Sequence, residues 1–470
     1  MSASMTHTSC MMQCCILLLS ILIASCGGGG KSTLTGGVGS GGTGVAEGVV
    51  SGFGSVIIAE LEYDDTDASV VLENASGQTE VTEVKLGQRV RIKHRKQGIA
   101  DTIQVLPQLI GTASTGQNAQ GEFTLLGQTV QNVTESDTQN TATVLNGLNS
   151  VSAGDELEVH GNWVLDRTRN YSVLIATRIE KLSSSVDPVL LSGVVRQRNG
   201  NVITLDNASG QNLQYTDIPA GLAAKSLMTA WLPRNELATS PWSAIRVVDA
   251  SPSVSESQRL VLNAQVSEYD LTQGEIRVQG LRVRLPNDNL STTPLAVGST
   301  VQIDIVREGG EYKTVALTQR QSSNDLGGLV TIKGSLLWPA NPARLSLRGN
   351  VVTIPNGLLA GNCGTLQSSD RVYLEITAQR AGPSNALRAT SMSCSLQIPS
   401  ASILSISGSL AQFNAANKTL QVETSKGTLV LTWTSSTLLP SNLSSLLNQH
   451  VEIEYQNVSG ENRLRKLKPG

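Results

Sequence analysis

The sequence predicts an all-β protein built from tandem small five-stranded barrels. Three observations lead to this fold class. Short segments alternate apolar and polar residues, which gives a strand one buried and one solvated face. Val, Ile, Leu, Thr, Ser and Gly dominate, and the Ala-, Glu- and Lys-rich runs typical of helices are missing. One weak pattern of strands recurs six times along the chain.

The first element is an apolar run from Ile16 to Ala24. It is shorter than the roughly 20 apolar residues that span a bilayer and fits the apolar segment of a secretory signal peptide. The tetrapeptide Ile23-Ala24-Ser25-Cys26 resembles the lipobox of bacterial lipoproteins. This resemblance implies a signal peptide over residues 1–25 and a lipid anchor on Cys26. An ordinary cleaved signal peptide is the alternative.

The residue after the lipobox bears on the destination of the chain. Gly27 stands where an Asp would resemble an inner-membrane retention signal. By resemblance, the protein is therefore expected at the outer membrane, held there through lipid on Cys26. Either face of that membrane, periplasmic or external, is compatible with this sequence.

A glycine-rich segment covers residues 26–47 and is expected to act as a tether. It offers few apolar side chains to bury, and a flexible coil of this length spans roughly 25 Å. Gly30-Lys31-Ser32 looks like the end of a phosphate-binding loop. That motif needs another glycine five positions earlier, where Ser25 stands, and a strand before it. No nucleotide or other cofactor is expected.

Six copies of one pattern account for the rest of the chain. Each copy has three alternating segments, a polar stretch, a glycine turn before a V-x-V/I strand, and a last strand that ends in an A-x-x-I-like motif. The expected copies cover residues 48–107, 108–185, 189–250, 258–320, 328–397 and 401–470.

The first copy illustrates the pattern. It opens at Gly48, turns at Leu86-Gly87-Gln88-Arg89, continues with Val90-Arg91-Ile92 and closes at Ala100-Asp101-Thr102-Ile103. Three strands, an irregular connection and two further strands are the order of an OB-like barrel, whose closure removes exposed strand edges. A small β-sandwich for each copy is the alternative.

These motifs carry a family resemblance. The G-x-V opening, the L-x-x-G-x-x-V-x-V segment and the A-x-x-I ending resemble an uncharacterised OB-like repeat family of Gram-negative bacterial lipoproteins, one of the domains of unknown function. The resemblance covers most of residues 45–469 and is clearest in the first two copies. It implies a fold and offers no catalytic residues. Because domains this small are marginally stable alone, we expect neighbouring copies to pack together.

Two cysteines of the mature chain are expected to form a disulfide. Removal of the leader leaves Cys26, Cys363 and Cys394, and Cys26 is assigned to lipidation. A bridge between the other two would form in an oxidising compartment and close a loop of about 30 residues, worth about 3–4 kcal/mol. Two buried free thiols are the alternative. No metal site is expected, because neither cysteine has a histidine nearby in sequence.

The charged clusters predict no active site. His94, His160 and His450 lie in three different copies and are expected at surfaces or barrel ends. Asp64-Asp65-Thr66-Asp67 lacks the glycine and glutamate of a calcium loop and is expected to be a solvated turn. Lys93-His94-Arg95-Lys96 is expected to be a wet turn, with contact to a lipopolysaccharide phosphate or an acidic partner as the alternative.

Composition narrows the function. A net charge of −3 and 3% aromatic residues argue against nucleic-acid binding. The tryptophans are scattered, and core or barrel-end packing is expected rather than a sugar platform for Trp163, Trp231, Trp242, Trp338 and Trp433.

We therefore expect a protein that is not an enzyme. Its predicted role is that of a structural or interaction module at the cell envelope, with an envelope protein or a glycan as its partner. A binding module for a glycan or small ligand is the alternative.

Overall fold

The computed structural model describes residues 44–469 apart from residues 59–60, 66–67, 97, 134–141, 271, 286–294, 321–328, 349, 360–362, 369, 382–385, 397–402, 425–426, 441 and 459. The predicted signal peptide, Cys26 and most of the predicted tether lie outside the described residues. Strand β1 (Gly44–Phe53) begins inside the segment that the sequence assigned to the tether. Folded structure therefore starts earlier than predicted.

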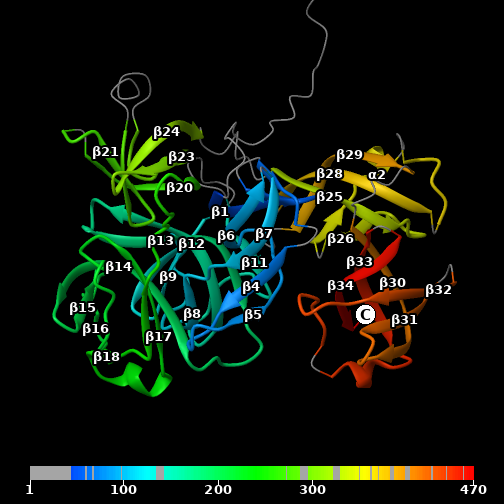
Figure 1. The fold of residues 1–470 in the computed structure, drawn as a ribbon, viewed down its shortest axis with the longest axis horizontal. Coiled ribbons are helices and arrows are strands. Elements are labelled where there is room, and N and C mark those ends of the chain that lie inside the picture. Colours follow the sequence, from blue (N-terminus) through cyan, green and yellow to red (C-terminus); the bar gives the residue numbers. More distant parts are fainter. Residues whose placement is uncertain are drawn as a thin grey trace, which may run out of the picture. The chain divides into compact units, whose positions relative to one another are not determined.

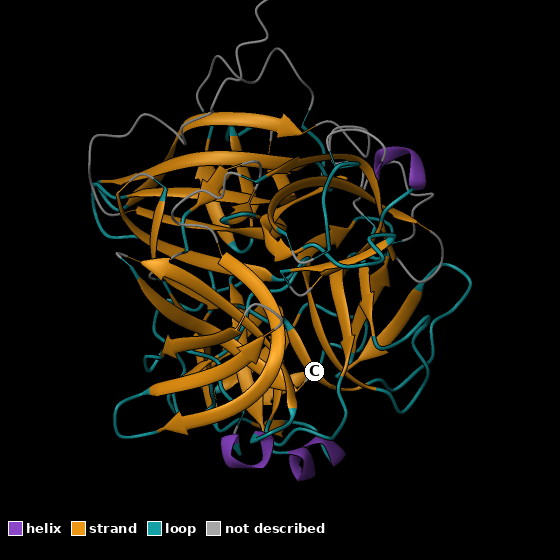
Figure 2. Cartoon of the chain, turned by 90° about the vertical axis from the view of Figure 1, so that its right-hand side faces the viewer, coloured by secondary structure: helices purple, strands orange, loops and turns teal. Residues whose placement is uncertain are grey.

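Nearly all regular structure in the described residues is β-strand, and the all-β prediction is confirmed (Figure 2). The helices of this part are short turns: η1 (Arg234–Ala238), α2 (Asn356–Leu359) and η3 (Leu443–Leu446). Within the same ranges, no helix has the length and apolar character needed to cross a bilayer.

The barrels are numbered 1 to 6 in the order of the six predicted copies. Barrel 4 shows the repeated unit in its simplest form (Figure 1). Neighbouring strands pair in the order β20–β21–β22–β24–β23, and β23 pairs back onto β20. The contact between β22 and β24 is parallel and the others are antiparallel, so five strands close into an OB-like barrel. Its strands are β20 (Arg259–Asp270), β21 (Glu275–Val278), β22 (Leu281–Arg284), β23 (Thr300–Glu308) and β24 (Glu311–Arg320).

Barrel 6 closes in the same order, β30–β31–β32–β34–β33 and back to β30. The closed barrels decide against the sandwich alternative. The strands of barrel 6 are β30 (Ile403–Asn414), β31 (Thr419–Thr424), β32 (Gly427–Thr432), β33 (His450–Val458) and β34 (Glu461–Pro469).

Barrels 5 and 3 follow the same plan with small changes. In barrel 5 the strands pair in the order β25–β28–β29–β27–β26, and in barrel 3 the fifth strand is split into β18 and β19. Barrel 5 has β25 (Leu329–Leu337), β26 (Arg344–Leu347), β27 (Asn350–Thr353), β28 (Arg371–Ala381) and β29 (Ala386–Ser395). Barrel 3 has β14 (Val189–Asn199), β15 (Val202–Leu205), β16 (Asn212–Gln214), β17 (Leu227–Leu232), β18 (Trp242–Ser243) and β19 (Arg246–Asp249).

Barrels 1 and 2 carry extra strands in the connection between the third and fourth barrel strands. Barrel 1 adds a hairpin, β4–β5, beside β7, and barrel 2 adds β11 beside β13. Besides β1, barrel 1 has β2 (Val56–Ile58), β3 (Leu61–Tyr63), β4 (Ser69–Glu73), β5 (Thr79–Val81), β6 (Arg89–Lys96) and β7 (Ile99–Val105). Barrel 2 has β8 (Leu109–Thr112), β9 (Glu122–Leu125), β10 (Gln128–Asn132), β11 (Val144–Asn146), β12 (Glu156–Asp166) and β13 (Tyr171–Lys181).

In barrels 1, 3, 4 and 6 the first strand is long and serves two partners within its barrel. In β30 the residues up to Ser409 pair with β33, and the residues from Ser409 onward pair with β31 across a bulge between Leu410 and Gln412. β1, β14 and β20 change partners at a bulge in the same way. Such a bend needs close backbone approach, and a Cβ on Gly408 would lie 2.4 Å from the carbonyl oxygen of Glu423. Gly408, a small residue at the opening of the last copy, thus allows β30 to coil.

First strands also join barrels to one another. β1 pairs in parallel with β20 and β25, β25 with β30, and β8 pairs antiparallel with β14. One hydrophobic core is shared by barrels 1 and 5 and another by barrels 2 and 3. The expected packing of copies that are adjacent in sequence therefore describes only part of the arrangement. Barrel 1 also joins barrels 4 and 5, which are distant from it in sequence.

A buried ion pair lies where barrels 1, 2 and 4 meet. Glu47 of β1 is 1% exposed and accepts hydrogen bonds from Arg89 Nη2 at 2.7 Å and from Arg91 Nε at 2.7 Å. Arg89 Nη1 also donates to Asn162 Oδ1 at 2.8 Å, and Gln279 Nε2 donates to the same oxygen at 3.0 Å. Burial raises the pKa of Glu47, but the charges and hydrogen bonds of the two arginines outweigh it and hold the pKa below its usual range.

Cys363 and Cys394 are joined by a disulfide, with their Cα atoms 5.5 Å apart. Cys394 belongs to β29, and Cys363 lies in the connection between α2 and β28. The bridge therefore ties this connection to the last strand of barrel 5.

Candidate functional site

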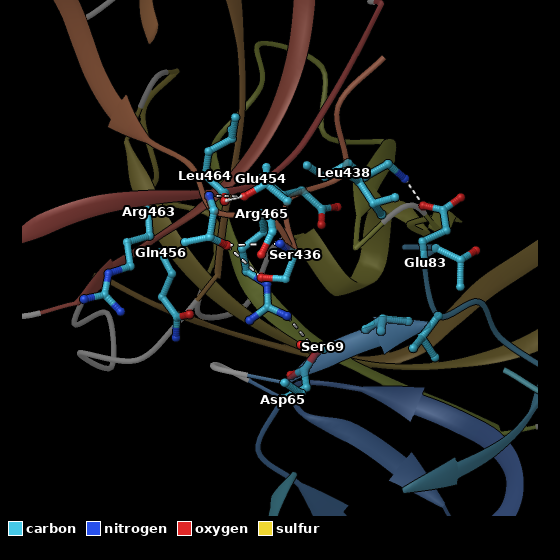
Figure 3. Close-up of a pocket in the computed structure, with 18 of the residues that line it drawn as sticks. Asp65, Ser69, Glu83, Ser436, Leu438, Glu454, Gln456, Arg463, Leu464 and Arg465 are labelled. Carbon is cyan, nitrogen blue, oxygen red and sulfur yellow. Dashed lines mark hydrogen bonds and ion pairs between the residues drawn. The ribbon is translucent and has the colours of Figure 1, made fainter. Parts of the chain in front are cut away.

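The candidate site is a cleft of about 330 Å³ with walls from barrels 1 and 6 and one long side chain from barrel 5 (Figure 3). We call it the three-barrel cleft. Barrel 1 supplies Asp65, which follows β3, and Glu83, which follows β5. Barrel 6 supplies β34 and the loop 434–438 after β32, and barrel 5 supplies Arg348 after β26.

Asp65 holds two arginines in place. Its side chain is buried, Arg348 Nη2 donates to its Oδ2 at 3.1 Å, and Arg465 Nη2 lies 3.5 Å from the same oxygen. Figure 3 shows Arg465 pointing from β34 toward Asp65. Burial raises the pKa of Asp65, but the charges of Arg348 and Arg465 outweigh it and keep the pKa below its usual range. The carboxylate is therefore ionised at neutral pH.

A second ion pair lies at the other end of the cleft. Lys466, the residue after Arg465 on β34, pairs with Glu83 of barrel 1. Both pairs join β34 to the connection between the third and fourth strands of barrel 1. They fix the cations of β34 against a wall that belongs to another barrel.

The loop after β32 presents hydroxyl groups. Thr434 and Ser436 share a hydrogen bond of 2.7 Å between their hydroxyls, and Thr434 N donates to Thr437 Oγ1 at 3.0 Å. Thr437 Oγ1 in turn donates to the carbonyl oxygen of Leu464 at 2.9 Å. This bond ties the loop to β34, and Ser435 is exposed at its tip.

Arg463 and Gln456 form the remaining polar wall. They are cross-strand partners on β34 and β33. Gln456 is buried, whereas the Arg463 side chain is 44% exposed and its Nε lies 3.4 Å from a carboxylate oxygen of Glu461. Arg463 is thus the cation of the lining that is most open to solvent among Arg348, Arg463, Arg465 and Lys466.

Two smaller recesses lie elsewhere in the described part of the chain. One of about 220 Å³ lies between barrels 5 and 6, adjoins the three-barrel cleft through Arg348, Glu454 and Lys466, and has apolar side chains such as Ile406 in its lining. Another, of about 160 Å³, lies between barrels 1 and 3 beside Trp231. The three-barrel cleft is larger and carries more charged groups.

The structure corrects two interpretations of charged clusters. Asp64-Asp65-Thr66-Asp67 was expected to be a solvated turn, but Asp65 is buried between arginines from two other barrels. Residues 66 and 67 lie outside the described residues. Lys93 and His94 were expected in a wet turn but belong to strand β6, which continues to Lys96 and pairs with both β1 and β7.

The histidines occupy different barrels, and one differs from expectation. His160 is fully buried rather than at a surface, because its strand faces barrel 1. Its Nε2 lies 2.8 Å from Glu158 Oε1, and its Nδ1 lies 3.2 Å from the carbonyl oxygen of Leu106. His450 is exposed at the start of β33.

None of the five tryptophans is among the described residues that line the three-barrel cleft. Trp163, Trp231 and Trp338 are buried, and Trp242 and Trp433 are half-buried. The cleft residues Arg348, Arg465 and Lys466 were not singled out from sequence. The only local signal was the basic closing segment Arg463 to Lys468 of the last copy.

No protein-family model matches this chain, and no curated protein is significantly similar to it. The resemblance to an OB-like lipoprotein repeat family therefore stays a prediction, and the site is interpreted from its own geometry.

Proposed function

We propose that this protein is a lipid-anchored, non-catalytic interaction module of the cell envelope, with the three-barrel cleft as its binding site. The observation that supports this proposal most directly is the set of cations that Asp65 and Glu83 position in the cleft. A preorganised group of donors binds a ligand without first ordering its own side chains.

The size of the cleft favours a small ligand or part of a glycan over a protein surface. Small-molecule sites are concave and have volumes of about 300–1,000 Å³, and the cleft falls at the lower end of that range. The second candidate, binding of an envelope protein, would use the rim of the same cleft. A photocrosslinking experiment detects either class of partner.

For this test, a photoreactive amino acid replaces Ser435, which is exposed at the tip of the hydroxyl loop. Thr168, exposed in the turn between β12 and β13, is the matched control position. Irradiation of cells is expected to produce a discrete adduct from position 435 and none from position 168. Adducts that are equal at both positions, or missing from both, would refute a binding role for the cleft.

The proposed anchor is tested separately. Cys26→Ala is expected to abolish fatty-acyl labelling and release the protein from the membrane fraction, because stable attachment needs covalent acyl chains. Cys15→Ala, in the predicted leader, is the matched control and is expected to keep both properties. Retention of the Cys26→Ala protein in the outer-membrane fraction would show that the anchor assignment is wrong.

A further inference from the structure

We propose that His160 is a proton-controlled switch at the contact between barrels 1 and 2. Its ring nitrogen Nδ1 lies between a donor and an acceptor of barrel 1, and a proton on that nitrogen determines which of the two it binds. The ring is fully buried, and a carboxylate holds its other nitrogen. Histidine is the side chain whose charge changes most readily between pH 5 and 8.

The ring enters the end of the hydrogen-bond ladder between β6 and β7. In an antiparallel ladder, the two residues of a hydrogen-bonded pair exchange two backbone bonds. Leu106 N donates to Arg89 O at 2.9 Å, which is one of these bonds. Arg89 N donates instead to His160 Nδ1 at 3.3 Å, and the carbonyl oxygen of Leu106 lies 3.2 Å from the same nitrogen. A side chain of barrel 2 thus takes the place of a backbone bond of barrel 1.

Glu158 holds the other side of the ring. Its Oε1 lies 2.8 Å from His160 Nε2. Burial and the charge of Glu180 raise the pKa of Glu158, but its interactions with His160 and Lys85 outweigh them and hold the pKa below its usual range. Glu158 is therefore a carboxylate, which can only accept a hydrogen bond. It follows that Nε2 carries a hydrogen in both charge states of the ring.

The charge of the ring then determines what Nδ1 does. In the neutral ring, Nδ1 has a lone pair and accepts the hydrogen bond from Arg89 N. In the charged ring Nδ1 carries a hydrogen, so it cannot accept this bond and donates to the carbonyl oxygen of Leu106 instead. That oxygen also accepts a hydrogen bond from Gln108 Nε2 at 3.2 Å, and its two lone pairs accommodate both donors. Proton uptake therefore exchanges Arg89 for Leu106 as the partner of Nδ1.

The other charged groups around the ring and Glu158 have partners of their own. Arg178, on β13 opposite the ring, pairs with Glu180 at 2.8 Å. Lys85 of barrel 1 pairs with the same carboxylate at 2.7 Å. The guanidinium of Arg89 has its buried counter-charge on β1. Glu158 is therefore the counter-charge of the ring when it takes a proton, and it keeps the ring in place.

Loss of the bond from Arg89 N acts on the junction of the barrels. A buried backbone N–H without an acceptor is costly, so the start of β6 is expected to open more often in acid. The side chain of Arg89 contacts Glu47 and Asn162, and Gln279 of barrel 4 contacts the same asparagine. A proton on His160 thus loosens a point at which three barrels meet.

Amide hydrogen exchange of the full chain in detergent, read by mass spectrometry of its peptides, tests the switch. Exposure times at about pH 5 and about pH 8 are matched for the intrinsic pH dependence of exchange. The peptide that contains Arg89 is expected to exchange about tenfold faster at the acidic pH, because it loses one buried hydrogen bond. The peptide of β17 is the internal control, because this buried strand of barrel 3 has no titratable side chain. Its exchange is expected to be equal at both pH values.

Two neutral substitutions separate the two states of the switch. His160→Asn keeps an oxygen acceptor close to the position of Nδ1, so the Arg89 peptide is expected to stay protected at both pH values. His160→Gln places its amide near the position of Nε2 and leaves Arg89 N without an acceptor, so the peptide is expected to exchange fast at both. His450→Asn, at an exposed histidine on β33, is the matched control and should keep the native pH dependence.

Two results would overturn the switch. One is equal corrected exchange of the Arg89 peptide at both pH values in the native protein. The other is a native pH dependence in His160→Asn, which would assign the effect to another group. If the His160 variants do not fold, Glu158→Gln gives a further test. Without its counter-charge the ring takes up a proton less readily, so the pH at which exchange accelerates is expected to fall, and an unchanged midpoint would contradict the mechanism.

Discussion

Glu47→Gln is expected to destabilise the protein by about 3–5 kcal/mol, the usual cost of breaking a buried ion pair from one side. The substitution leaves the guanidinium of Arg89, whose side chain is 1% exposed, without its counter-charge. Because Arg89 also contacts Asn162 of barrel 2, the loss is expected to loosen the junction of barrels 1, 2 and 4. Urea unfolding followed by tryptophan fluorescence measures the effect as a lower midpoint.

Glu275→Gln is the matched control for this prediction. Glu275 pairs with Arg282 at 3.7 Å, and Arg282 is 68% exposed. Exposed ion pairs contribute about 0–1 kcal/mol, so the control is expected to change the midpoint very little. Equal midpoints for the two variants would contradict a stabilising role for the buried pair.

Asp65→Asn is expected to separate barrel 6 from barrel 1 and to cost about 3 kcal/mol at neutral pH, because Arg348 loses its buried counter-charge. Asp65 has a lowered pKa in the folded protein, so the unfolded chain binds a proton more readily there. Its stabilising contribution is therefore complete above the ordinary carboxyl pKa and is lost as the pH falls through the lowered value. Asparagine does not titrate, so the free energy of unfolding of the Asp65→Asn variant lacks this contribution to its pH dependence.

Urea midpoints measured at neutral pH and at acidic pH test the Asp65 prediction. The difference between the native protein and Asp65→Asn is expected to be large at neutral pH and to shrink as the solution becomes acidic. Asp217→Asn, at an exposed position in the turn after β16, is the control and should follow the native protein within about 0.5 kcal/mol. A native-minus-variant difference that stays constant with pH would show that Asp65 does not titrate as described.

The strands of a single barrel could be predicted from the sequence because they are marked by turns and by the alternation of neighbouring residues. The turn at Leu86-Gly87 and the following alternation predict β6, which begins at Arg89. Strand β17 (Leu227–Leu232) is poorly marked in the sequence, and the structure shows that it is buried along its whole length. A strand buried on both faces shows no alternation of apolar and polar residues, so the pattern that marks the other strands could not mark this one.

The cleft could not be predicted in the same way. Asp65 and Arg465 stand 400 positions apart in the sequence and meet only because first strands join barrel 1 to barrel 5 and barrel 5 to barrel 6. An acidic cluster that is read locally resembles any solvated turn. Its burial depends on which barrels pack together, and six similar alternating patterns give no preference for one pairing over another.

The central position of β1 has a consequence for the order of folding. Its parallel partners, β20 and β25, are made only after barrels 2 and 3 are complete. Until then β1 offers unpaired backbone groups along the edges that these partners will cover, and such edges invite association with other chains. Contacts between distant segments also form slowly, because the loop between them must close first. The first barrel to emerge is therefore among the last to be finished, and β1 is exposed to association with other chains during that interval.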